Sequence, residues 1–181
     1  MPRSTAAFTL ALACAILLAA PPARAQGQAD TLGVNFAALR TSAPSSHVLR
    51  QLYPGFGIEF TAPLHNRWSL DAEADFLSPF ASAWLQETLV GVRYRAAQGR
   101  RWAFYLAARP GWLYLNSGFG AAFSTVGPAF DFAFALGGTA ELRISRRWLW
   151  RVRAGDLLIH GSYGFFPANN LQFSTGLALR F

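Results

Sequence analysis

Apolar and polar residues alternate along most of this chain, and the alternation limits the folds that the chain can adopt. In LQFSTGLALRF, residues 171–181, every odd position except Thr175 is apolar, and every even position is small or polar. Successive side chains of a β-strand point to opposite faces, so a period of two predicts a strand with one apolar face. Residues 130–144 repeat the pattern, with three phenylalanines separated by an aspartate and an alanine.

Eight segments of strand length carry this alternation. They lie at 31–40, 55–62, 67–76, 86–96, 102–115, 130–144, 147–156 and 171–181. A tilted strand crosses a membrane with about 9 to 11 residues, whereas a membrane helix needs about 20 apolar residues. No apolar run after residue 20 approaches that length, although 52% of the chain is hydrophobic. The apolar content is therefore spread over strands.

The connections between these segments alternate between long and short. Long connections rich in Gly, Pro, Ser and Ala lie at 41–54, 77–85, 116–129 and 157–170, and short ones lie at 63–66, 97–100 and 145–146. Long loops at one end and tight turns at the other are typical of an up-and-down barrel. We predict an all-β fold, an eight-stranded antiparallel up-and-down transmembrane β-barrel with both termini at the periplasmic turn end.

The N-terminal segment differs from the rest of the chain. Arg3 precedes an apolar run at 6–20, and the segment ARA that ends at Ala25 has the small-x-small spacing that signal peptidase reads. The apolar run is too short to span a membrane as a helix, and two prolines follow it directly. We predict a cleaved signal peptide at 1–25 and an outer-membrane β-barrel domain at 26–181.

The apolar face of the strands is predicted to point outward. A soluble barrel of the lipocalin type would show the same alternation with its apolar face turned inward. An eight-stranded barrel is only just wide enough inside for side chains. The aromatic residues of the apolar face would not fit there together: Trp102, Phe104, Trp112, Phe130, Phe132, Phe134, Trp148 and Trp150. A membrane barrel is therefore favoured, and a soluble ligand-binding barrel is the alternative.

Charged residues fall mostly on the face opposite the aromatic ones. An arginine that faced lipid near the membrane midplane would cost about 2 to 4 kcal/mol, so we expect these side chains to point inward. There each charge needs an opposite charge as its partner. The predicted lumen charge network comprises Glu59, Asp71, Glu73, Asp75, Glu87, Arg93, Arg95, Arg109, Asp131, Glu141, Arg143, Arg151, Arg153 and Arg180. A lumen filled by these side chains disfavours a diffusion pore.

The segment SRRWLWRVR, residues 145–153, has the composition of a basic and aromatic nucleic-acid patch. Alternation separates its residues, because Trp148 falls on the outer face and the arginines of RVR fall on the inner one. Trp68 and Trp102 also follow an arginine just after a predicted short turn. We predict that the three tryptophans form an interfacial girdle, and we expect no nucleic-acid partner. The net charge of +7 bears on solubility and nonspecific association alone.

With these features the chain resembles the small outer-membrane β-barrel family of the OmpA type, a group of porin-like barrels of Gram-negative bacteria. The resemblance covers residues 26–181 and includes the C-terminal strand NNLQFSTGLALRF, which ends in Phe181. It implies a place in the bacterial outer membrane, in contact with its lipid and lipopolysaccharide. It also implies assembly by the barrel-assembly machinery, with Phe181 as part of the assembly signal. It implies little about activity.

One pair of residues has the spacing of a catalytic motif. Some eight-stranded outer-membrane barrels are lipid A 3-O-deacylases with a His-x-Ser pair, a spacing that His160 and Ser162 share. A serine nucleophile needs a base and an acid that orients the base. However, Tyr163 stands where those enzymes have asparagine, and no carboxylate follows the pair. We therefore expect a non-enzymatic structural or surface-interaction protein, with a deacylase-like esterase as the alternative.

The remaining candidates predict no cofactor. His47 and His65 stand alone in connections, so no cluster of ligands for a metal is expected. The segment GFGAAFSTVG, residues 118–127, has glycines but lacks the lysine of a phosphate loop. We interpret it as a surface loop whose Phe119 and Phe123 could meet a partner.

Overall fold

The computed structural model describes residues 29–41, 51–78, 85–115, 129–161, 164–165 and 170–181. These residues form β1 (Thr31–Thr41), β2 (Gln51–His65), β3 (Trp68–Leu77), β4 (Leu85–Gln98), β5 (Trp102–Leu115), β6 (Ala129–Arg143), β7 (Trp148–Gly161), β8 (Gly164–Phe165) and β9 (Leu171–Arg180). No helix in the described ranges has the length and apolar character needed to cross a membrane.

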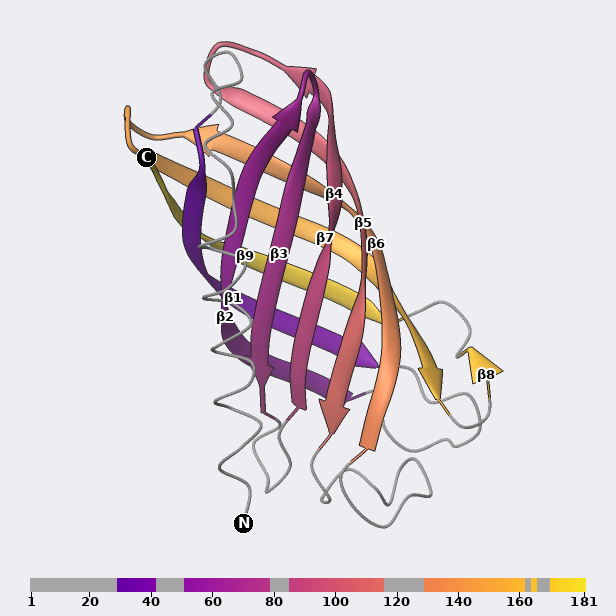
Figure 1. Ribbon diagram of the computed structural model, residues 1–181. Helices are drawn as coiled ribbons and strands as arrows, with labels where there is room; N and C mark the ends of the chain where they lie inside the picture. The colour runs from indigo at the N-terminus through magenta and orange to yellow at the C-terminus, as the bar shows by residue number, and fades with distance from the viewer. Residues whose placement is uncertain (1–28, 42–50, 79–84, 116–128, 162–163, 166–169) are drawn as a thin grey trace.

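Eight long strands close into one antiparallel barrel (Figure 1), which confirms the predicted fold class. Each long strand pairs with the long strands before and after it in the chain, from β1 with β2 to β7 with β9. β1 also pairs with β9, from Thr31 opposite Arg180 to Arg40 opposite Leu171. This last pairing closes the sheet on itself and removes its two edges. β8 adds two residues that pair with the end of β7.

The barrel has a turn end and a loop end. At the turn end Asn66 and Arg67 join β2 to β3, residues 99–101 join β4 to β5, and residues 144–147 join β6 to β7. Asn66 has φ of 53°, a left-handed conformation that asparagine tolerates in tight turns. The backbone N–H of Phe181 donates to the carbonyl of Asp30 at 3.1 Å, so both sides of the closing seam reach the turn end. Figure 1 shows the C-terminus beside the short turns and β8 at the opposite end.

β2 is longer than its sequence pattern indicated. It begins at Gln51 and includes Pro54, which was expected in a long connection. The Pro54 carbonyl accepts a hydrogen bond from the N–H of Ser78 at 3.0 Å, just beyond the end of β3. The N–H and the carbonyl of one residue in a strand point to the same neighbouring strand. The N–H that Pro54 lacks would therefore point beyond the end of β3, where no strand residue needs it, so β2 tolerates the proline.

β7 also extends beyond its expected limit. It continues to Gly161, and β8 follows inside the predicted long connection 157–170. Ile159 lies opposite Ala133 of β6, and Leu157 lies opposite Ala135. Pairing with β6 therefore continues the strand beyond the point where the local sequence suggested a loop.

The outer surface of the barrel is apolar. Burial alternates residue by residue along β1, with Leu32, Val34 and Phe36 exposed and their neighbours buried. The large aromatic residues assigned to the apolar face are exposed, except for the half-buried Phe134. This is the reverse of a soluble barrel that encloses a ligand with its apolar face.

The described interior has three layers. Toward the loop end lies an apolar layer, formed by Ala37, Leu39, Tyr53, Leu77, Leu85, Leu89, Leu113, Ala133, Ala135, Leu157 and Ile159. In the middle lies a charged layer, formed by Glu59, Asp71, Glu73, Arg93, Arg109, Glu141, Arg151 and Arg153. At the turn end lies an arginine-rich cavity of about 110 Å³, the turn-end cavity.

Candidate functional site

The charged layer is built from inward positions of six strands. β2 supplies Glu59, β3 supplies Asp71 and Glu73, and β6 supplies Glu141. The arginines come from the other three strands, with Arg93 on β4, Arg109 on β5, and Arg151 and Arg153 on β7. Residues two apart on a strand share a face, so the pairs 71 and 73, and 151 and 153, both point inward.

Arg153 occupies the centre of the charged layer. Its Nη2 lies 3.0 Å from Glu59 Oε2 and 3.5 Å from Asp71 Oδ2, and its Nη1 forms an ion pair with Glu73. Arg109 forms an ion pair with Glu73 as well, and its Nη1 lies 3.8 Å from Asp71 Oδ2. Two arginines thus share the same two carboxylates of β3.

Arg151 connects this group to the next carboxylate. Its Nη1 donates to Glu59 at 2.5 Å, and its Nη2 lies 2.6 Å from Glu141 Oε1. Arg93 donates to the same Glu141 oxygen at 2.6 Å, and its guanidinium lies 4.1 Å from the centre of the Tyr105 ring. The result is one continuous set of ion pairs across the barrel.

The charges of this layer balance. Its four arginines and four carboxylates are buried, each with at most 7% of its surface exposed. Burial of an ion costs several kcal/mol, a cost that is offset only when opposite charges and hydrogen bonds surround it. Here each ion contacts a partner from another strand, so removal of one member would leave an uncompensated charge.

Two further carboxylates lie beside the charged layer without an arginine. Asp75 and Glu87 lie opposite each other on β3 and β4 and are fully buried. No arginine of the described residues lies within ion-pair distance of either. Glu87 accepts a hydrogen bond from Gln172 at 2.9 Å. Gly57 makes room for Asp75, because a Cβ at this position would overlap the carboxylate.

The other members of the predicted network lie elsewhere. Arg95 and Arg180 are half-buried and Arg143 is exposed, and all three line the turn-end cavity. Asp131 is half-buried near the loop end, on β6. Alternation predicts the face of a residue but not its height along the barrel axis, which explains why these four residues lie outside the charged layer.

The tryptophans of the predicted girdle lie at the same end of the barrel. Trp68, Trp102 and Trp148 are the first residues of β3, β5 and β7, and each is about half exposed. The Trp68 ring lies 5.1 Å from the ring of Tyr94. Phe181 is also exposed at this end, with 63% of its surface accessible. These positions place aromatic rings around the outside of the turn end.

His160 interacts electrostatically with Asp131 of the neighbouring strand β6. Its side chain is exposed near the end of β7, opposite Phe165 of β8, and Ser162 lies outside the described residues. His65 is exposed at the end of β2, whereas His47, Phe119 and Phe123 lie outside the described residues. No group of three or more His, Cys, Asp or Glu side chains in the described part could hold a metal ion.

Two features of the interior were absent from the sequence-based expectations. The apolar layer uses inward leucines such as Leu113, whose neighbour Trp112 is also apolar, so alternation gives no signal there. The turn-end cavity includes Arg100 and Arg101, which belong to a short turn and carry no strand pattern. The sequence feature that could have indicated the turn-end cavity is the presence of several arginines next to predicted turns.

Several solved structures that are similar to this fold are small outer-membrane β-barrels. The chain is similar to Neisserial surface protein A, with a TM-score of 0.58 and 13% identity over 84% of this chain and 97% of that chain. It is similar to the N-terminal β-barrel domain of Pseudomonas aeruginosa OprF, with a TM-score of 0.58 and 13% identity over 86% and 100%. For the outer membrane protein Ail of Yersinia pestis in a nanodisc, the TM-score is 0.50, with 11% identity over 85% and 99%.

Sequence comparison adds no closer relative. No protein-family model matches the chain, and no curated protein matches it. At these low identities the structural likeness establishes the fold, which is that of the small outer-membrane β-barrels.

Proposed function

We propose that this chain is an integral protein of the bacterial outer membrane, of the OmpA-type group, with a structural or surface-interaction role and no enzymatic activity. The exported form begins at Gln26, after removal of the signal peptide. Its described strands cross the membrane, and its lumen is filled by side chains and does not conduct. Lipid and lipopolysaccharide surround it, and the barrel-assembly machinery reads the strand that ends in Phe181.

The single observation that carries this proposal is the apolar outer surface of a closed barrel. Large apolar side chains are exposed on all eight long strands, and several are about half or more exposed: Val34, Phe36, Phe56, Leu106, Phe130 and Leu171. Monomeric soluble proteins rarely expose apolar patches larger than a few hundred Å². In a bilayer the same surface is favourable, and closure satisfies the backbone groups that lipid cannot pair.

The filled interior supports the absence of conduction. The apolar layer includes six leucines that are at most 1% exposed: Leu39, Leu77, Leu85, Leu89, Leu113 and Leu157. Next to it, the charged layer spans the barrel with ion pairs between β7 and strands β2, β3 and β6. An ion that crossed the barrel would have to displace both layers.

Fractionation tests the location. The protein, expressed with its leader in a Gram-negative host, should appear in the outer-membrane fraction with Gln26 at its N-terminus. Folded barrel should migrate differently from boiled protein on a denaturing gel. Recovery in the soluble periplasm, or migration that boiling does not change, would contradict the proposal.

A purified sample separates the non-enzymatic role from the deacylase alternative. We expect no release of acyl chains from lipopolysaccharide by the folded protein. Deacylation that is abolished by His160→Ala and by Ser162→Ala would establish the alternative in its place. Planar bilayers with the same sample should show no stable conductance.

A further inference from the structure

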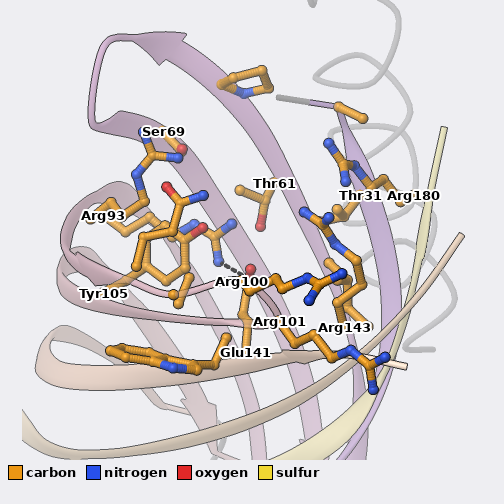
Figure 2. Close-up of a pocket in the computed structure, with 18 residues that line it drawn as sticks. Thr31, Thr61, Ser69, Arg93, Arg100, Arg101, Tyr105, Glu141, Arg143 and Arg180 are labelled. Atoms are coloured by element: carbon orange, nitrogen blue, oxygen red, sulfur yellow. Dashed lines mark hydrogen bonds and ion pairs between the residues drawn. The ribbon is translucent and has the colours of Figure 1, made fainter. Parts of the chain in front are cut away.

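The turn-end cavity concentrates positive charge. Six arginines line it: Arg93, Arg95, Arg100, Arg101, Arg143 and Arg180. Glu141 is the one carboxylate among the described residues of the lining, and it already forms ion pairs with Arg93 and with Arg151 of the charged layer. Figure 2 shows Arg93 and Tyr105 on one side of the cavity and Arg143 and Arg180 on the other.

Three of the six arginines of this cavity contribute positive charge that no carboxylate of the described residues neutralises. Among the described residues, no carboxylate lies within ion-pair distance of Arg100, Arg101 or Arg143. Guanidinium groups that share a small space repel one another, although solvent that reaches them weakens the repulsion. An anion in the cavity would relieve this repulsion, and arginine binds phosphate oxygens through two parallel hydrogen bonds.

The size and lining of the cavity suit a small tetrahedral anion. Its volume is about 110 Å³, several times the volume of about 10–15 Å³ that one bound water needs. Ser69, Thr61, Gln98 and Tyr105 add hydroxyl and amide groups to the lining. The cavity therefore has room for a phosphate group and neutral donors beside the guanidinium groups.

The rim of the cavity continues onto the apolar outer wall. Trp102 and Ala103 line the cavity and also line a shallow outer groove with Phe104, Trp150 and Val152. A phospholipid could place its phosphate at the arginines and an acyl chain along this groove. A free phosphate would use the arginines alone.

We propose that the turn-end cavity is a binding site for a phosphate group, held mainly by Arg100, Arg101 and Arg143. The ligand is either the headgroup of an anionic phospholipid or a free phosphate. Only the lipid source depends on the proposed membrane location, because binding of free phosphate requires the folded barrel alone.

Two arginine pairs with equal charge make a matched test. The double variant Arg100→Ala/Arg143→Ala removes two cavity arginines, and Arg146→Ala/Arg147→Ala removes two exposed arginines of the neighbouring turn that do not line the cavity. Purified protein in octyl glucoside, a detergent without phosphate, is titrated with inorganic phosphate by calorimetry. Phosphatidylglycerol retained from mixed phosphatidylcholine and phosphatidylglycerol micelles is counted by native mass spectrometry.

We expect the cavity pair to weaken phosphate binding or lipid retention by about tenfold or more, since each lost charged hydrogen bond contributes over 1 kcal/mol. The turn pair should stay close to the parent protein. If the cavity pair loses only lipid retention, the ligand is a phospholipid headgroup. If it loses only the phosphate binding seen by calorimetry, the ligand is a free anion. Equal loss in both pairs, or no binding of either ligand by the parent, would overturn the proposal. All variants must show the gel shift of the folded parent, which separates this result from a failure of the barrel itself.

Discussion

Arginine occupies two neighbouring regions of the barrel interior, and its surroundings differ between them. In the charged layer, four arginines meet four carboxylates, all buried. The turn-end cavity shares Arg93 and Glu141 with that layer, whereas its Arg100, Arg101 and Arg143 have no carboxylate partner among the described residues and are exposed to solvent. The same residue type thus holds strands together in one region and leaves positive charge available in the other.

This difference teaches that charge balance, and not residue type, decides what an interior arginine does. A buried guanidinium with two carboxylates has all its charge compensated, so its removal leaves buried anions behind. An exposed guanidinium is hydrated, and its removal costs little. The following substitutions test this contrast, in order of decreasing expected effect.

Glu73→Ala should be the most harmful change. Glu73 pairs with both Arg109 and Arg153, so the substitution leaves two buried cations short of a partner. Loss of one member of a buried charge group costs about 3–5 kcal/mol. Urea unfolding of the barrel in lipid vesicles, followed by tryptophan fluorescence, should show this fall in the free energy of unfolding. Glu73→Gln keeps the side-chain volume, so its free energy of unfolding should fall less than that of Glu73→Ala. An unchanged urea midpoint for Glu73→Ala would refute the stabilising role of the charged layer.

Leu89→Ala tests the apolar layer by the same measurement. Leu89 is fully buried inside the barrel, so its truncation leaves a cavity and should lower the free energy of unfolding by about 3 kcal/mol. Leu106, 53% exposed on the outer wall of β5, gives the control. Leu106→Ala should cost clearly less in lipid, because no interior cavity forms. Equal losses would show that the interior leucines are not tightly packed.

Asp75→Asn should act in the opposite direction. Asp75 is fully buried without an ion-pair partner in the described part of the chain, so burial disfavours its ionised form. We expect the free energy of unfolding to rise by about 1 kcal/mol. Asp71→Asn is the matched control on the same strand, and it should destabilise the barrel because Asp71 lies near Arg109 and Arg153. A fall in the free energy of unfolding for both Asp75→Asn and Asp71→Asn would mean that Asp75 has a cationic partner.

Arg143→Ala should have the smallest effect. Arg143 is exposed at the end of β6, so its loss should leave the urea midpoint within measurement error. Arg151→Ala, on the paired strand and fully buried, should shift the midpoint strongly. If both variants shifted it equally, the contrast between the two regions would fail.

Alternation predicted the fold and the outer face because both depend on local pattern. The exposed positions Leu171, Phe173 and Leu177 follow directly from the period of two in the last strand. Strand ends were less accurate. Pro54 and Gly161 resemble loop residues, but they lie in strands, where they pair with Ala38 and Gly164.

The partners inside the barrel could not be read from the sequence. Arg153 meets Glu59 and Arg151 meets Thr31 because the stagger of strands places them at one height. That stagger is a property of the closed sheet, since each strand's register depends on its neighbours. The alternation therefore predicted the inward face of the strands, but not that Asp131 and Arg143 lie outside the charged layer.

The seam between β1 and β9 joins the earliest described strand to the latest one. In an apolar medium each backbone group on an open edge costs several kcal/mol. A chain that has formed only β1 to β7 would carry two such edges, and β9 is the strand that pairs with both. The proposed insertion into the membrane must therefore wait for β9, whatever the order in which the earlier hairpins form.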